Sequence, residues 1–217
     1  GGGTGFTALR QKHPEWFSDA VIPENFSGEP FRDAKDRWCG TCLSSFGIVF
    51  NRDVLRRLGI EKDPTQWSDL ADPRLQGMVA LADPGRSSSV TKAFEMLIQQ
   101  EMQRSLAQLT QSPGHLKPEE IDVEAARRGW EAGLALIQRI SANARYFSDT
   151  STKIPLDVLR GDAAAGMCID FYGRSAEESV RRADGSSRIG FVMPVGGTSI
   201  SVDPIAMMRG APDPELA

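Results

Sequence analysis

The chain has 217 residues, of which 40% are hydrophobic and 25% are charged, a composition that excludes a collagen-like, low-complexity or wholly disordered protein. Its 29 acidic residues outnumber its 25 basic ones, and the net charge of -4 argues against a nucleic-acid-binding protein. Three cysteines are too few for a disulfide scaffold, and no apolar run approaches the roughly 20 residues that cross a bilayer.

The first part of the chain is rich in glycine and proline. It begins Gly1-Gly2-Gly3-Thr4-Gly5, without a Met or a signal peptide, so we expect a processed or trimmed chain or a piece of a larger protein. This start resembles a phosphate-binding loop, but it lacks the Lys-Ser/Thr pair of a P-loop and is weak support for a nucleotide. The composition of residues 7–16 predicts a helix, and residues 18–37 are predicted to be irregular.

Strands and helices alternate in the rest of the chain. Short apolar, aromatic and β-branched runs predict strands at residues 46–51, 78–82, 144–147, 163–169, 188–195 and 200–208. Helical patterns lie between them, at residues 52–58, 90–109, 118 onward, 155–159 and 176–182. The alternation predicts an α/β fold, a mainly parallel sheet with flanking helices.

Tryptophan positions give a further prediction about packing. Trp130, Leu134 and Ile137 fall on one face of the helix that follows residue 118. All four tryptophans of the chain are predicted to pack in the core or under a lid rather than to form a ligand cage.

Three of the predicted strands are followed by polar clusters, at residues 86–89, 149–153 and 170–174. Ligands of open α/β sheets bind beyond the carboxyl ends of the strands. Serine hydroxyls and free N–H groups at helix starts favour anions there. The pattern therefore indicates a cleft for an oxyanion or a carboxylate, and the alternative is that these serines and threonines only cap helices.

Cys39 and Cys42 form a CxxC motif that is compatible with a redox pair, with half a metal site, or with a structural role as thiols or as a disulfide. No second CxxC exists, and His13 and His115 lie in unrelated contexts. The motif is predicted to lie in a loop before a strand, which favours the structural role. Cys168, inside an apolar strand, is predicted to be buried. No hydrolase motif is present.

Several segments, in order, resemble ABC-transporter solute-binding proteins. The run Phe46-Gly47-Ile48-Val49-Phe50-Asn51 with Leu58-Gly59 resembles the family's hinge segment, and further similar segments lie at residues 67–77, 79–89, 159–166, 194–206 and 210–217. The ferric-iron, sugar-phosphate and related anion binders are the most similar branch. The resemblance implies a bilobal type-2 periplasmic-binding fold and a monomer outside the cytoplasm. It also implies delivery of a solute to an inner-membrane ABC permease, with no catalysis, cofactor or nucleic acid.

The same resemblance implies a division into lobes. Residues 1–45 would be part of lobe 1, residues 46–200 would be lobe 2, and residues 201–217 would return into lobe 1. The hinge strands would lie near residues 46–51 and 198–205. A complete member is longer, so the chain looks like a fragment with one complete lobe, and we expect it alone to bind its ligand weakly or not at all.

The candidate ligand-binding residues come mainly from the three polar clusters. They are Arg86, Ser87, Ser88, Ser89, Thr150, Ser151, Thr152, Tyr172 and Arg174, with Gly2, Gly3 and Thr4 facing them from the other lobe. Iron-binding members have adjacent tyrosines where this chain has Phe171-Tyr172. Since one phenolate is a poor ferric site, we predict that the solute is a small phosphorylated or carboxylated anion and that no metal is bound. If the solute is ferric iron instead, Tyr172 is the predicted ligand.

Three alternatives stay open. The first is a ferric-iron-binding transport protein of the same family. The second is a ligand-sensing effector domain of a LysR-type transcription regulator, although the chain contains no helix-turn-helix. The third is a thiol enzyme that uses Cys39 and Cys42.

Overall fold

The computed structural model of the protein describes residues 5–206, without the side chains of residues 88 and 89. The chain divides into two compact units. Unit 2 consists of Ser45–Ser199, and unit 1 consists of the described residues on either side of it. The chain therefore passes between the units twice, once inside strand β3 (Cys39–Asn51) and once at the start of β8 (Ile200–Ile205).

Unit 1 has short elements, namely α1 (Gly5–Lys12), the 3₁₀ helix η1 (Pro14–Phe17), β1 (Asn25–Phe26) and β2 (Glu29–Pro30). The helix predicted over 7–16 ends at Lys12, and a 3₁₀ turn begins at Pro14, whose nitrogen carries no hydrogen for a helical bond. The segment predicted to be irregular contains a hairpin. Its turn residues Ser27 and Gly28 have φ of 50° and 87°, a conformation that matches the twist of paired strands.

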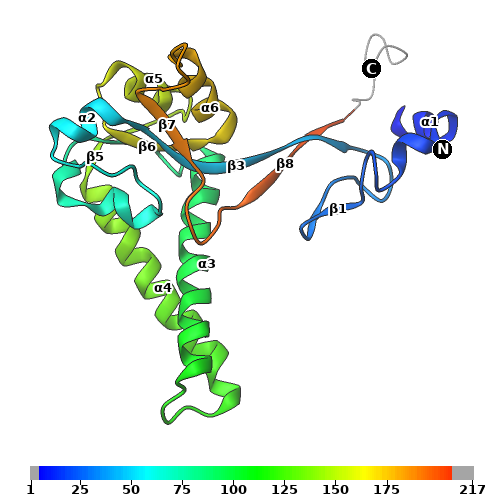
Figure 1. The fold of residues 1–217 in the computed structure, drawn as a ribbon. Coiled ribbons are helices and arrows are strands. Elements are labelled where there is room, and N and C mark those ends of the chain that lie inside the picture. Colours follow the sequence, from blue (N-terminus) through cyan, green and yellow to red (C-terminus); the bar gives the residue numbers. More distant parts are fainter. Residues whose placement is uncertain (1–4, 207–217) are drawn as a thin grey trace. The chain divides into compact units, whose positions relative to one another are not determined.

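The sheet that underlies unit 2 has the order β5-β4-β6-β3-β7, and β8 also pairs with β3 (Figure 1). Its other strands are β4 (Val79–Ala82), β5 (Ala144–Ser148), β6 (Ala165–Ile169) and β7 (Ile189–Val192). Strand β4 is parallel to β5 and β6, whereas β3 is antiparallel to β6 and β7. Four strands of this order therefore run one way and only β3 opposes them, which confirms the α/β fold with a mainly parallel sheet.

Strand β3 begins at Cys39, earlier than the predicted start at residue 46. The extension pairs with β8, and the Thr41 hydroxyl donates to the backbone oxygen of Asp203 at 2.9 Å. The prediction that the CxxC motif lies in a loop is therefore wrong. Residues three apart on a strand point to opposite faces and stand about 10 Å apart, too far for a disulfide.

The cysteines are accordingly free thiols, with Cys39 buried and Cys42 exposed. Burial raises the pKa of Cys39, whereas a redox-active thiol has a lowered pKa. Cys168 is buried in the core, as predicted, and burial also raises its pKa. None of these three cysteines thus shows a feature that favours the thiol-enzyme alternative.

Helices cover both faces of the sheet. They are α2 (Arg52–Arg57), α3 (Ser88–Gln111), α4 (Pro118–Ala142), α5 (Lys153–Arg160) and α6 (Asp170–Ser179), with the 3₁₀ helices η2 (Trp67–Ala71) and η3 (Pro73–Leu75). Ile48 and Met167 pack in one apolar cluster with residues of α3, α4 and η2. Their strand neighbours Val49 and Cys168 pack in a second cluster with residues of α5 and α6. Adjacent strand residues therefore serve opposite cores, as a sheet buried on both faces requires.

Helices α3 and α4 lie side by side (Figure 1), and small residues of α4 allow their close approach. A Cβ atom at Gly129 would lie 2.2 Å from the Cα of Met102, and one at Gly133 would lie 2.7 Å from the Cα of Ile98. Neither helix, nor any other in the described part of the chain, combines the length and apolar character of a membrane span.

The buried face of α4 is Ala125, Gly129, Gly133, Leu136 and Ile140. The prediction that Trp130 packs in the core is therefore wrong. Trp130 and Leu134 are 52% and 46% exposed, and Trp16 is 42% exposed, whereas Trp67 is buried at 2%. The apolar spacing of Trp130 and Leu134 is real, but small residues on another face of the helix provide the tighter packing against α3.

Replacement of Gly129 by valine should destabilise the protein. The new side chain would collide with the backbone of α3, and overpacking of this kind costs about 1–3 kcal/mol. Ala132→Val on the exposed side of the same helix is the control and should cost less than about 1 kcal/mol, the size of a helix-propensity effect. Urea unfolding followed by circular dichroism measures both. Equal losses for the two variants would contradict the close approach of α3 and α4.

Candidate ligand-binding site

The carboxyl ends of β4, β5 and β6 meet at one edge of the unit 2 sheet. Ala82 at the end of β4 is paired in register with Ser148 at the end of β5, and the N–H of Asp83 donates to the Ser148 carbonyl at 2.7 Å. Because β3 runs in the opposite direction, Phe46 near the middle of that strand is paired with Ile169 at the end of β6. Ser45 therefore reaches the same edge, where its hydroxyl donates to Asp170 Oδ2 at 3.1 Å.

The loop after β4 is a tight turn that leads into α3. The N–H groups of Arg86 and Ser87 donate to the carbonyl of Asp83 at 3.0 and 2.8 Å. Ser87 is the N-cap residue of α3 and is buried, but its side chain does not make the capping hydrogen bond. Arg86 is exposed, and its nearest carboxylate is Asp83 at 3.9 Å. A guanidinium so weakly paired is able to take an anion from solution.

The loop after β5 holds the second predicted cluster. The hydroxyls of Thr150 and Thr152 are 2.9 Å apart, and the Thr152 N–H donates to Thr150 Oγ1 at 3.3 Å. Ser151 between them is buried. Thr152 is the N-cap of α5, again without a capping bond from its side chain. The hydroxyls of Thr150 and Thr152 thus order the loop itself.

The third cluster forms the start of α6. Tyr172 is half-buried with its ring 4.2 Å from that of Phe171, and the Arg174 guanidinium stacks over Phe191 at 5.4 Å. Gly173 makes this packing possible, because a Cβ there would lie 2.2 Å from the Phe191 ring. Tyr172 and Arg174 do not line the cavity that the first two clusters form.

A cavity of about 600 Å³ opens at the carboxyl ends of β4 and β5. Its lining residues are Asp83, Arg86, Tyr146, Phe147, Ser148, Asp149 and Lys153. Of the candidate residues that the structure describes, Arg86 is the one that lines it. Asp149 and Lys153 lie within the predicted polar cluster 149–153 and could have been chosen on that ground. Tyr146 and Phe147 lie in strand β5, and no local pattern in the sequence indicates which of their side chains faces a cavity.

Lys153 is held in place by a buried carboxylate. Its ammonium pairs with Asp157 Oδ2, the hydroxyl of Tyr146 donates to the same oxygen, and Lys153 Nζ lies 4.0 Å from the Tyr146 ring centre. Burial and this hydrogen bond raise the pKa of Tyr146. Burial opposes ionisation of Asp157, but the bonds from Lys153 and Tyr146 outweigh it and lower the pKa of that carboxyl. At neutral pH the wall of the cavity therefore carries a fixed ammonium beside a neutral phenol.

Part of the predicted site lies beyond these observations. Gly2, Gly3 and Thr4 lie outside the described residues, as do the side chains of Ser88 and Ser89. Within residues 5–206, no group of three or more His, Cys, Asp or Glu side chains is arranged to hold a metal ion.

Residues 17–217 match the family described as bacterial extracellular solute-binding protein. The fold is similar to that of the periplasmic binding protein AfuA from Actinobacillus pleuropneumoniae, solved with exogenous fructose-6-phosphate bound. That likeness has 19% identity, covers 85% of this chain and 48% of that one, and has a TM-score of 0.58. The periplasmic binding protein P5PA is similar at 17% identity, over 97% of this chain and 49% of that one, with a TM-score of 0.59. The fold is therefore that of type-2 periplasmic binding proteins, and the chain spans about half of each of these structures.

Curated relatives are similar in sequence as well. The phosphoglycerate transport regulatory protein PgtC of Salmonella typhimurium is 26% identical over 141 residues, which are 65% of this chain and 28% of PgtC. The chain therefore matches less than a third of that protein's length.

Replacement of Asp157 by asparagine should destabilise the protein by about 2 kcal/mol at pH 7, because a buried carboxylate that accepts two hydrogen bonds is lost. The pKa of Asp157 is lowered by folding, so its contribution is present at neutral pH and is lost as the pH falls through the folded-state pKa. The difference between the two proteins should therefore shrink below about pH 4. Thermal unfolding between pH 3 and 7 measures it.

The exposed Asp149 on the same edge is the matched control. Asp149→Asn should change the free energy of unfolding by less than about 0.5 kcal/mol at any of these pH values. A difference between wild type and Asp157→Asn that stays constant with pH would contradict the ionised, hydrogen-bonded state of Asp157.

Proposed function

The chain belongs to the bacterial extracellular solute-binding proteins, and from this premise we propose that it is the solute-binding component of an ABC transporter. It is a monomer that captures a small anionic solute outside the cytoplasm and delivers it to a membrane permease. It binds the solute without chemical change. The single observation that supports a binding site is the cavity at the carboxyl edge of the unit 2 sheet. Ligands of open α/β sheets bind at this edge.

The charges of this cavity favour a solute with one strong anionic group and several hydroxyls. Arg86 and Lys153 supply two cations, of which Arg86 is the more available because Lys153 is paired with Asp157. Asp83 and Asp149 line the same cavity and would repel a second anionic group, but their oxygens accept hydrogen bonds from hydroxyls. A phosphorylated sugar or a hydroxylated organic acid carries both features.

The relatives support the phosphorylated choice. AfuA was solved with fructose-6-phosphate, and PgtC is named for phosphoglycerate transport. Ferric iron, the alternative within the family, has Tyr172 as its candidate ligand, but the side chain next to it is Phe171 and supplies no oxygen. We therefore place the phosphorylated or carboxylated solute first.

The lobes are part of this proposal. Unit 2 would be the second lobe, and the two passages of the chain near Ser45 and Ser199 would be the hinge. Ligand would stabilise a closed state through contacts that an open state lacks.

Calorimetric titration of the full-length protein with fructose 6-phosphate, phosphoglycerate, citrate and ferric citrate tests the proposal. A phosphate ester or an organic acid should bind, and Arg86→Gln should weaken binding about 10- to 100-fold, because a hydrogen bond to a charged group contributes about 1.5–3 kcal/mol. Arg139→Gln, an exposed arginine of α4 outside the cavity, is the control and should bind as wild type does. Binding of ferric citrate alone, or full affinity in Arg86→Gln, would contradict the anionic solute.

A further inference from the structure

The opposite edge of the unit 2 sheet carries a second cavity, of about 530 Å³. It lies where β3 and α5 end. Its lining residues are Asn51, Asp53, Val54, Arg56, Arg57, Arg160, Gly161 and Arg188. None of them lines the cavity at the carboxyl edge, so this is a separate place on the molecule.

Positive charge dominates this second cavity. It has four guanidinium groups and one carboxylate, that of Asp53, which lies 3.3 Å from Arg56. The carboxyl end of α5 points its last carbonyls toward this region and offsets about half of another charge. Among the lining residues, positive charge therefore exceeds negative charge by more than about two, although the chain as a whole has a net charge of -4. Outside the lining, the carboxylate of Asp157 interacts with the charge of Arg160.

The guanidinium N–H groups are the main hydrogen-bond donors that this cavity presents to a ligand. The Asn51 oxygen accepts from two N–H groups of α2, and its amide nitrogen donates one hydrogen to the Val158 carbonyl at 2.9 Å. Arg188 makes one hydrogen bond, from Nη2 to the Leu159 carbonyl at 3.3 Å. Arg57 and Arg160 make no hydrogen bond or ion pair with another described residue, and Arg57 Nη2 lies beside Gly161.

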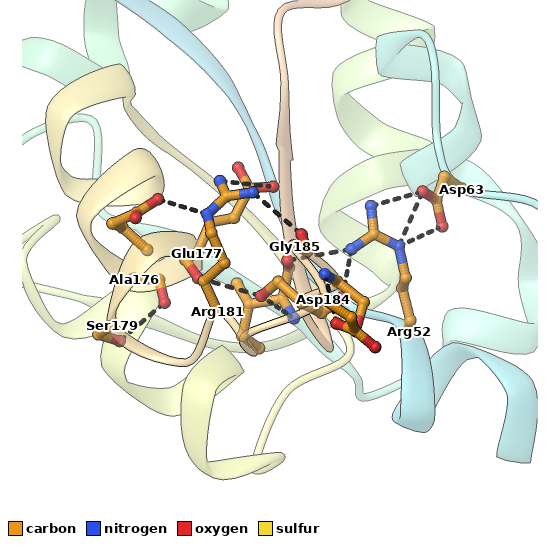
Figure 2. A network of polar contacts seen from close by, with 12 residues as sticks. Arg52, Asp63, Ala176, Glu177, Ser179, Arg181, Asp184 and Gly185 are labelled. Atoms are coloured by element: carbon orange, nitrogen blue, oxygen red, sulfur yellow. Dashed lines mark hydrogen bonds and ion pairs between the residues drawn. The ribbon is translucent and has the colours of Figure 1, made fainter.

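Neighbouring arginines are used differently. Figure 2 shows Arg52 and Arg181 tied to carboxylates and to backbone carbonyls. Arg52 donates to Asp63 and to the carbonyls of Ser187 and Ile189, and Arg181 donates to Glu178 and to the Gly185 carbonyl. These side chains hold loops in place. Within residues 5–206, Arg57 and Arg160 make no such bonds, and the charge of Arg160 acts on Asp157 only through space.

We propose that this cavity is a second binding site, for a soluble small polyanion with at least two phosphate or carboxylate groups. Guanidinium forks match the oxygens of phosphate and carboxylate two at a time. The volume lies within the range of about 300–1,000 Å³ that small-molecule sites occupy. The excess of positive charge matches a ligand with more than one negative charge. This proposal does not rest on the identity of the transported solute.

Calorimetric titration of the full-length protein with inorganic pyrophosphate at low salt tests the site. The double variant Arg57→Glu/Arg160→Glu should lose at least tenfold in affinity for pyrophosphate. Arg139→Glu/Arg145→Glu changes the net charge by the same amount at exposed positions outside both cavities and should bind as wild type does. Arg86→Gln should also retain binding, which separates this site from the one at the carboxyl edge.

Four results would overturn the proposal, of which three concern the site and the fourth concerns its specificity. The first three are no binding of pyrophosphate by the wild type, unchanged affinity in Arg57→Glu/Arg160→Glu, and loss of binding in Arg86→Gln. Sodium acetate, with a single charge, should bind at least tenfold more weakly than pyrophosphate, and equal binding would overturn the polyanion specificity. Circular dichroism of each variant shows that the fold is retained.

Discussion

The packing of strand β3 is the constraint on which the rest of unit 2 depends. It lies between β6 and β7, opposes the direction of both, and sends Ile48 into one core and Val49 into the other. Gly47 leaves room for the ring of Phe191, which also fills the space that a side chain at Gly173 would need. The same ring therefore sets the distance of α6 from the sheet. A side chain at Gly47 would displace Phe191 and with it the start of α6, where Asp170 meets Ser45.

The two edges of this sheet differ in charge for a topological reason. Parallel strands collect at their carboxyl ends the loops that begin α3, α5 and α6, and the cavity there mixes two cations with two carboxylates. The opposite edge collects the ends of β3 and α5, where arginines predominate. A mixed edge suits a solute with an anionic group and hydroxyls, and a basic edge suits a polyanion. One domain thus offers two chemically different surfaces.

Sequence reasoning predicted the sheet well and the side-chain neighbourhoods less well. The strands at residues 78–82 and 144–147 and the loops after them lie close to their predicted bounds, because apolar runs and turn residues are local signals. The predicted core position of Trp130 is wrong, because α4 packs against α3 through a stripe of small residues on another face. The predicted loop at the CxxC motif is wrong, because pairing with β8 extends β3 back to Cys39 and local sequence does not show this pairing. Arg86, a candidate from the sequence, lines the cavity, whereas no sequence pattern predicted the link between Lys153, Asp157 and Tyr146.

By itself, the sequence determined the order of the elements, the α/β class and the resemblance to solute-binding proteins, since these depend on periodicity and on short motifs along the chain. Only the tertiary structure decided that Asp83 and Asp149 share a cavity, that Asp157 holds Lys153, and that Arg57 and Arg160 flank one pocket. The physical reason is that strand register and helix packing bring together residues that are distant in the chain. No local pattern encodes which of two polar side chains faces a cavity and which faces solvent.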